Sequence, residues 1–134
     1  MTSIQDLGLA VKRLQWRHHR TANTRLAAIG TSLAQWDVLR QLQAHPQASL
    51  HDLALLTFQT DQSMGSLAAR MVDHGLLDRV DGPGRAVRHH LTDDGARVLD
   101  VGGTVMDGVL AETVGRLSAD ERATLLALLT RATD

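Results

Sequence analysis

The chain has 134 residues, a formal net charge of −1 and no cysteine. This length suffices for one domain with a core that buries roughly two-thirds of the unfolded surface, and the lack of cysteine excludes disulfides, thiolate zinc sites and a cysteine nucleophile. No run approaches the ~18 apolar residues of a membrane span, and no leader is recognisable. We therefore expect a single soluble, cytoplasmic domain over residues 1–134, without membrane association.

Apolar residues at three- and four-residue steps predict a long amphipathic helix over residues 4–29. Gly30 ends this helix, because glycine adopts positive φ at little cost. Ser32 then begins a second helix and matches a capping box with Gln35, and Pro46 closes it. The apolar stripe of this second helix contains Leu33, Trp36, Leu39 and Leu42.

The stretch from Leu50 to Thr92 carries the most information. Ser49 with Asp52 predicts the start of a short helix, a connection follows over residues 57–60, and a longer helix is expected over residues 61–74. Met64, Leu67, Ala68 and Met71 form the expected inward face of the longer helix. This pair of helices has the spacing of a helix-turn-helix.

Two short extended runs follow Gly75. Residues 76–80 and 87–91 are predicted to pair across a turn at residues 82–84, since Val87, His89 and Leu91 alternate with polar residues. A helix-turn-helix followed by a β-hairpin is the order of a winged helix. In that arrangement the second helix enters the DNA major groove and the hairpin lies beside it.

The candidate DNA-contacting residues lie on the outward face of the 61–74 helix and on the wing. They are Gln62, Ser63, Ser66 and Arg70 on the helix, and Arg85 and Arg88 on the wing. Gln62 can pair bidentately with adenine and the serines can donate or accept, whereas Arg70 suits a phosphate. We expect Arg85 to enter the minor groove and Arg88 to lie near the DNA backbone.

A long helix is predicted from Asp93, and Ser118 with Glu121 caps a last helix. Interior glycines interrupt the first of these, at Gly102, Gly103, Gly108 and Gly115. They indicate either a kink or a neighbouring backbone that approaches closely. Residues 1–30 are mainly basic and residues 93–134 mainly acidic. This asymmetry suits two terminal regions that pack together, within or between chains, and two solvated helix faces explain it equally well.

The chain resembles MarR-family transcriptional regulators over essentially its whole length. The resemblance rests on residues 33–39, on Leu53-Ala54, on residues 70–79, and on Arg85 upstream of Leu91-Thr92 and Gly95. It implies an α+β, predominantly helical fold, with a winged helix-turn-helix lobe and a two-stranded wing over residues about 32–92. Helices over residues about 4–29 and 93–133 would form a homodimer, so that two recognition helices meet an imperfect palindrome in double-stranded DNA. The implied role is that of a ligand-responsive repressor.

Two residues depart from the family pattern. Pro83 replaces a usual acidic residue of the wing, so an ion pair that anchors Arg85 must use Asp81 or be absent. Ser66 stands where a basic residue is frequent. Between residues 57 and 92 the arginines only equal the acidic residues, and phosphate attraction dominates most DNA affinity. We therefore expect a modest DNA binder that depends on being bivalent.

In regulators of this kind a small aromatic or lipophilic effector occupies a cleft beside the dimerisation helices. Trp16, His18 and Trp36 are the candidate lining residues. An apolar stripe also explains Trp36, as an ordinary core residue.

Other functional classes have less support. The seven histidines include two adjacent pairs, whose side chains point apart, so we predict no metal site. No phosphate loop, nucleophile elbow or patterned carboxylate pair is present, and we expect neither a cofactor nor an enzyme. The alternative from another class is a winged-helix module for protein–protein contact without specific DNA binding. The balanced local charge keeps that alternative open.

Overall fold

The computed structural model describes residues 1–82, 84 and 87–134. In chain order the elements are α1 (Ile4–Ala27), α2 (Leu33–Ala44), α3 (Leu50–Leu56), α4 (Asp61–Asp73), β1 (Leu77–Asp81), β2 (Val87–Leu91), α5 (Asp93–Ala111), the short 3-10 helix η1 (Val114–Arg116) and α6 (Ala119–Thr133). The predominantly helical α+β fold with a two-stranded wing is confirmed.

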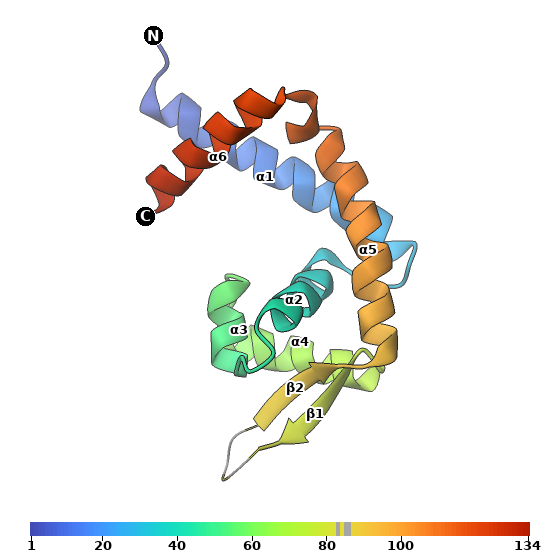
Figure 1. Ribbon diagram of the computed structural model, residues 1–134. Helices are drawn as coiled ribbons and strands as arrows, with labels where there is room; N and C mark the ends of the chain where they lie inside the picture. The colour runs from blue at the N-terminus through green and yellow to red at the C-terminus, as the bar shows by residue number, and fades with distance from the viewer. Residues whose placement is uncertain (83, 85–86) are drawn as a thin grey trace.

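The elements divide into two groups along the molecule (Figure 1). Helices α2, α3 and α4 and the hairpin gather at one end, α1 and α6 lie at the other, and α5 runs between the groups. The hairpin is antiparallel, with Leu77 opposite Leu91 and Asp81 opposite Val87. The result is a compact lobe joined to an open pair of terminal helices.

The core of the lobe forms where the apolar stripes of α2, α3 and α4 meet. The predicted inward face of α4 is confirmed, because Met64, Leu67, Ala68 and Met71 are all buried. Leu39 of α2 and Leu53 of α3 are fully buried against them. Each such side chain contributes about 1.5–3 kcal/mol relative to an exposed one. This burial fixes which face of α4 remains outside.

Side-chain caps set most helix starts. The reciprocal capping boxes expected for Ser49 with Asp52 and for Ser118 with Glu121 are both present. The box expected at Ser32 is only half formed. Ser32 Oγ accepts the backbone N–H of Gln35 at 3.2 Å, but the Gln35 carbonyl oxygen Oε1 accepts from the Thr31 hydroxyl at 3.1 Å. The neighbouring hydroxyl competes successfully for the glutamine side chain.

The expectation for the glycines of α5 was wrong in two respects. Gly115 lies beyond the end of α5, in η1. At Gly102 the close neighbour is a side chain rather than a backbone, since an added Cβ would lie 2.5 Å from Cδ1 of Trp36. A backbone does approach at Gly95, where an added Cβ would lie 2.1 Å from the carbonyl oxygen of Leu76. These contacts hold α5 against the lobe.

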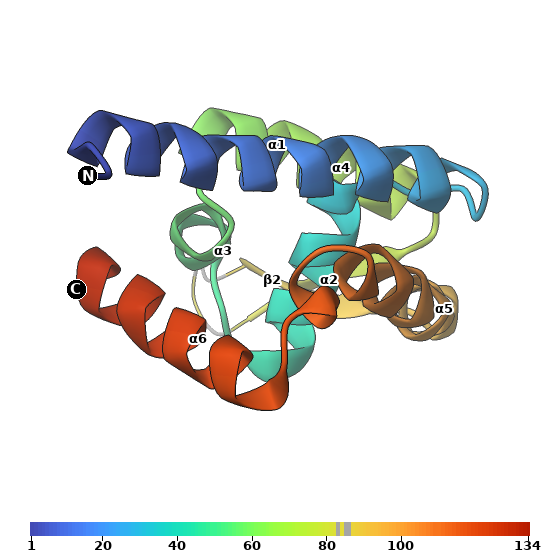
Figure 2. The same cartoon turned by 90° about the horizontal axis from the view of Figure 1, so that it is seen from above.

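The terminal helices leave apolar surface uncovered. Exposed large hydrophobic residues on α1 and α6 include Ile4, Leu7, Leu9, Val11, Trp16, Leu126, Leu128 and Leu129. No residue of α6 is buried. Helices α1 and α6 overlap in Figure 1 but lie apart when the molecule is seen from above in Figure 2. Within the described residues, no helix is long and apolar enough to cross a membrane.

Two side-chain contacts join α1 to the end of α5. Arg25 pairs with Glu112 at 2.6 Å, so one ion pair links the basic first helix to the acidic C-terminal region within the same chain. His18 Nε2 lies 2.5 Å from Thr113 Oγ1. Burial, and secondarily the charge of Arg17, lowers the pKa of His18. Both contacts fix the angle between α1 and α5.

Candidate nucleic-acid interface

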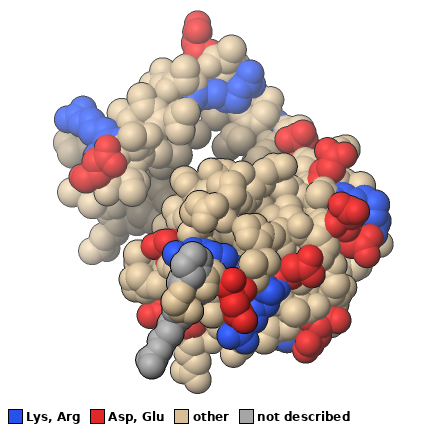
Figure 3. Space-filling view, turned by 60° about the horizontal axis from the view of Figure 1, so that its bottom comes forward, with Lys and Arg blue, Asp and Glu red and all other residues tan. Residues whose placement is uncertain are grey.

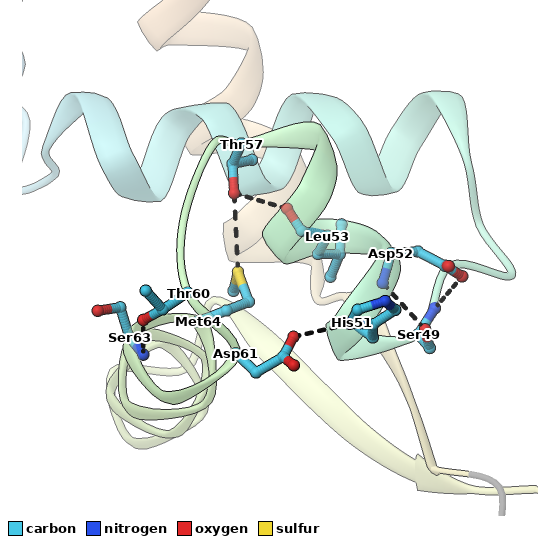
Figure 4. Close-up of polar contacts among 9 residues, drawn as sticks. All are labelled: Ser49, His51, Asp52, Leu53, Thr57, Thr60, Asp61, Ser63 and Met64. Carbon is cyan, nitrogen blue, oxygen red and sulfur yellow. Dashed lines mark hydrogen bonds and ion pairs between the residues drawn. The ribbon is translucent and has the colours of Figure 1, made fainter.

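The connection between α3 and α4 is held by a local network of polar side chains (Figure 4). The Thr57 hydroxyl donates to the carbonyl oxygen of Leu53 at 2.6 Å. Gln59 donates in turn to Thr57 Oγ1 at 2.9 Å. Thr60 Oγ1 accepts the backbone N–H of Ser63 at 3.1 Å, which starts α4. The angle between the two helices is thus set by hydrogen bonds as well as by the core.

Phe58 in this connection has an uncommon backbone conformation. Its φ is +59°, in the left-handed region, and it is the only non-glycine residue with positive φ among the described residues. Its side chain is 95% exposed. The turn therefore carries backbone strain that no burial of the phenyl ring offsets.

The predicted reading face of α4 lies together on the outside of the lobe. Gln62, Ser63, Ser66 and Arg70 are all exposed. With Gln59, Ala34 and Leu67 they line a surface hollow of about 430 Å³. These side chains project opposite the buried stripe of the same helix and are free to contact a ligand.

An ion pair that the sequence analysis did not predict lies at the start of α4. His51 Nδ1 of α3 is 2.9 Å from Asp61 Oδ1, the first residue of α4. The hydrogen bond with Asp61 raises the pKa of His51, and the charges of Asp61 and Asp52 raise it further. The two residues are ten positions apart on different helices, so no periodic pattern connects them. Only the crossing of α3 over α4 brings them together.

On the wing, Arg88 is described and Arg85 lies outside the described residues. Arg88 is half-buried, and its guanidinium donates to the carbonyl oxygen of Val87 at 3.0 Å. Asp81, expected as the partner of Arg85, has Arg79 Nε at 3.9 Å. The expected pairing of Asp81 with Arg85 also falls outside the described residues.

His89 is the buried residue of strand β2. Burial lowers its pKa, and the charges of Arg79 and His90 act in the same direction. A neutral imidazole is therefore favoured inside the hairpin near neutral pH. His89 is best described as part of the wing's packing.

The charges on the face of the lobe that carries the hairpin are mixed rather than uniformly basic. Figure 3 shows basic and acidic side chains interspersed over the lobe, where they are arginines and aspartates. The balance is that expected from the sequence, in which arginines and acidic residues are equal in number across residues 57–92. Long-range attraction to phosphates is correspondingly weak.

The three residues proposed for a ligand cleft do not lie together. Trp16 is 56% exposed and stacks on His19, and it lines a hollow with Arg13, Arg17, Arg20, Thr21, Thr24 and Arg25. His18 is engaged with Thr113. Trp36 is buried, donates its indole N–H to the carbonyl oxygen of Leu99 at 3.1 Å, and lies under Arg40. Trp36 belongs to the buried core, and it also lines a separate hollow of about 360 Å³ with Arg40 and Gly103. Among the described residues, no three histidine or acidic side chains are placed to hold a metal ion.

The helix pair α3–α4, its exposed polar face and the adjoining hairpin define a winged helix-turn-helix protein. A sequence profile of the MarR family matches residues 29–86. The solved structure of the PcaV transcriptional regulator of Streptomyces coelicolor with its natural ligand is similar at 28% identity, with a TM-score of 0.83, over 100% of this chain and 98% of that one. The chain is therefore similar to MarR-family regulators, by sequence over residues 29–86 and by fold over its whole length.

Two further solved structures share the fold. A variant of MarR from Escherichia coli, complexed with operator DNA, is 23% identical with a TM-score of 0.86, over 96% of this chain and 94% of that one. The MarR-family protein RV2887 of Mycobacterium tuberculosis, in complex with p-aminosalicylic acid, is 23% identical with a TM-score of 0.78, over 96% and 98%. No curated protein sequence matches the chain significantly.

Proposed function

We propose that the chain is a sequence-specific, double-stranded DNA-binding transcriptional regulator that acts as a ligand-responsive repressor. The observation that carries this proposal is the exposed polar face of α4, with Gln62, Ser63, Ser66 and Arg70 above a fully packed inner face. A recognition helix in a winged helix-turn-helix presents such a face to base edges. The operator complex of the E. coli relative supports the same use of the fold.

The two groups of elements have different proposed roles, namely DNA binding for the lobe and dimerisation for the terminal helices. Residues 32–92 form the DNA-binding lobe, with Arg85 in the minor groove and Arg88 near the backbone. Residues 4–29 and 93–133 form a homodimer, because the exposed apolar side chains of α1 and α6 need a cover. A dimer with recognition helices roughly 34–36 Å apart would meet successive major grooves of an imperfect palindrome.

The proposed effector is a small aromatic compound, and an acidic one fits best. The hollow beside Trp16 measures about 480 Å³, and four arginines of α1 line it: Arg13, Arg17, Arg20 and Arg25, the last of which also pairs with Glu112. Arginines bind carboxylates bidentately and lie on aromatic faces. The ligand complexes of PcaV and RV2887 support small-molecule control in relatives. Among the three candidate cleft residues, we therefore retain Trp16.

The decisive experiment is a fluorescence-anisotropy titration against the DNA upstream of the chain's own gene, at two salt concentrations. We expect saturable binding that is at least about 10³-fold tighter than binding to unrelated DNA. Equal, weak binding to every duplex would contradict the proposal. It would favour a winged-helix module for protein–protein contact, the alternative that the mixed charge in Figure 3 supports.

A further inference from the structure

The ion pair between His51 and Asp61 occupies the reading end of the recognition helix (Figure 4). Asp61 is the first residue of α4 and shares its first turn with Gln62 and Ser63. Its side chain is 70% exposed, and that of His51 is 66% exposed. The pair is therefore accessible to any duplex that the face of α4 contacts.

The chemistry of a carboxylate limits what Asp61 can recognise. An ionised carboxylate only accepts hydrogen bonds, so guanine O6 and N7 and thymine O4 offer it nothing. Adenine has an N6 amino donor, but the neighbouring acceptor N7 repels a carboxylate. The cytosine N4 amino group is the donor with which aspartate and glutamate pair in the major groove. His51 contacts Oδ1 of Asp61, which leaves Oδ2 available to a base. The histidine thus restricts the rotation of the carboxylate without using both of its oxygens.

We propose that Asp61 is a specificity-determining residue that accepts a hydrogen bond from the amino group of a cytosine in each half-site, and that His51 is its positioning residue. This inference rests on the proposed function, because it requires α4 to lie in the major groove. Without a contact to cytosine, the side chain of Asp61 would only place a favourable negative charge at the N-terminus of α4.

The charges around His51 make the contact depend on pH. The carboxylates of Asp61, on α4, and Asp52, on the same helix as His51, both raise the pKa of His51. The charge of Arg88, on β2, lowers the pKa of Asp52. A protonated His51 offsets the charge of Asp61, which DNA phosphates repel. Because the pKa of His51 is raised above 6.5, chiefly by its hydrogen bond with Asp61, the offset persists at higher pH than for a free histidine. Specific affinity should fall as pH rises through the pKa of His51.

The first test selects bound duplexes from a randomised pool with the unaltered chain, Asp61→Ala, Asp61→Asn and Asp73→Asn. We expect the unaltered chain to enrich one cytosine per half-site by about five- to tenfold over other bases, the lower part of the range for a base contact. Asp61→Ala should lose that preference alone. Asp61→Asn should move it to adenine, with which asparagine pairs bidentately. Asp73→Asn removes the same charge from the far end of α4 and should leave the selected sequence unchanged.

The outcomes separate this inference from the proposed function. If the unaltered chain enriches no sequence, both fail. If it enriches a palindrome and Asp61→Ala enriches the same palindrome with the same preference at every position, only this inference fails. If Asp61→Ala lowered the affinity for all sequences equally and also lowered the melting temperature, Asp61 would only stabilise the helix. That result would also overturn this inference.

The second test measures the affinity for the selected site between pH 6 and 8.5 with the unaltered chain and with His51→Gln. Glutamine can keep a hydrogen bond to Asp61 but does not titrate, so the variant should lose the pH dependence and retain the cytosine preference. If His51→Gln instead weakened binding to all sequences and lowered the salt dependence by one phosphate contact per subunit, His51 would be a phosphate ligand. That result would overturn its positioning role.

Discussion

Gly102 of α5 lies directly against the indole ring of Trp36 of α2. An added Cβ at Gly102 would lie 2.5 Å from Cδ1 and 2.8 Å from Nε1 of that ring. Three residues earlier on α5, the carbonyl oxygen of Leu99 accepts the indole N–H. The Cδ1–Nε1 edge of the ring thus contacts α5 at two residues, and this helix joins the lobe to the terminal helices. The glycine is present because a side chain would not fit.

We therefore predict that Gly102→Ala destabilises the protein by about 1–3 kcal/mol, the usual cost of overpacking a core. The neighbouring Gly103 provides a matched control, since nothing lies within 4 Å of its added Cβ. Gly103→Ala should stabilise α5 by about 0.5–1 kcal/mol through helix propensity. Urea unfolding at fixed protein concentration measures both. Equal effects of the two substitutions would show that Trp36 does not constrain Gly102.

Phe58 supplies a prediction about backbone strain. Its φ of +59° costs an L-residue roughly 1–2 kcal/mol, and its exposed ring gains little from packing. Phe58→Gly should remove the strain and, after the extra entropy of glycine in the unfolded chain, raise stability by about 0.5–1 kcal/mol.

Phe58→Ala is the matched variant, because it removes the phenyl ring but keeps the Cβ that causes the strain. Its melting temperature should not exceed that of the unaltered chain. If alanine stabilised the protein as much as glycine does, exposure of the ring rather than the backbone conformation would be the destabilising feature.

Much of the fold was predictable because its signals are local. The inward stripe of α4 follows from helical spacing within thirteen residues, and the capping pairs Ser49–Asp52 and Ser118–Glu121 are each three residues apart. The cap at Ser32 was predicted incompletely, since the sequence pattern does not include competition from Thr31. Local patterns fix element starts but not every hydrogen bond.

The parts that the sequence analysis missed depend on contacts between distant elements. The His51–Asp61 pair arises only from the crossing of two helices. Trp36 was ambiguous, because an aromatic residue on an apolar stripe can line a cleft or fill a core, and its partners Leu99 and Gly102 lie on a helix far along the chain. The role of the glycines in α5 could not be assigned without knowing which surface faces them.

The capping box of α3 predicts a pH effect on stability. Asp52 accepts the backbone N–H of Ser49 at 3.0 Å, and this hydrogen bond is the main cause of its pKa lying below 3.8. A carboxyl group with a lowered pKa stabilises the folded state above its unfolded pKa, and this contribution is lost as pH falls through the folded value. The stability difference between the unaltered chain and Asp52→Asn should therefore shrink from pH 5 downwards. A difference that stays constant to pH 3 would contradict the assignment.

The two ends of the α4 face should affect DNA binding differently. Gln62 lies in the first turn and Arg70 in the last turn of the helix. Since base edges are read near the N-terminus of a recognition helix, Gln62→Ala should cost about 1–3 kcal/mol on the preferred site and little on other DNA. Arg70→Ala should weaken every sequence alike and reduce the salt slope by about one phosphate contact per subunit. Anisotropy titrations on specific and unrelated duplexes over a salt series measure both quantities. If Gln62→Ala lowered specific and non-specific affinity equally, Gln62 would be a phosphate contact, and the reading face of α4 would have to be assigned to other side chains.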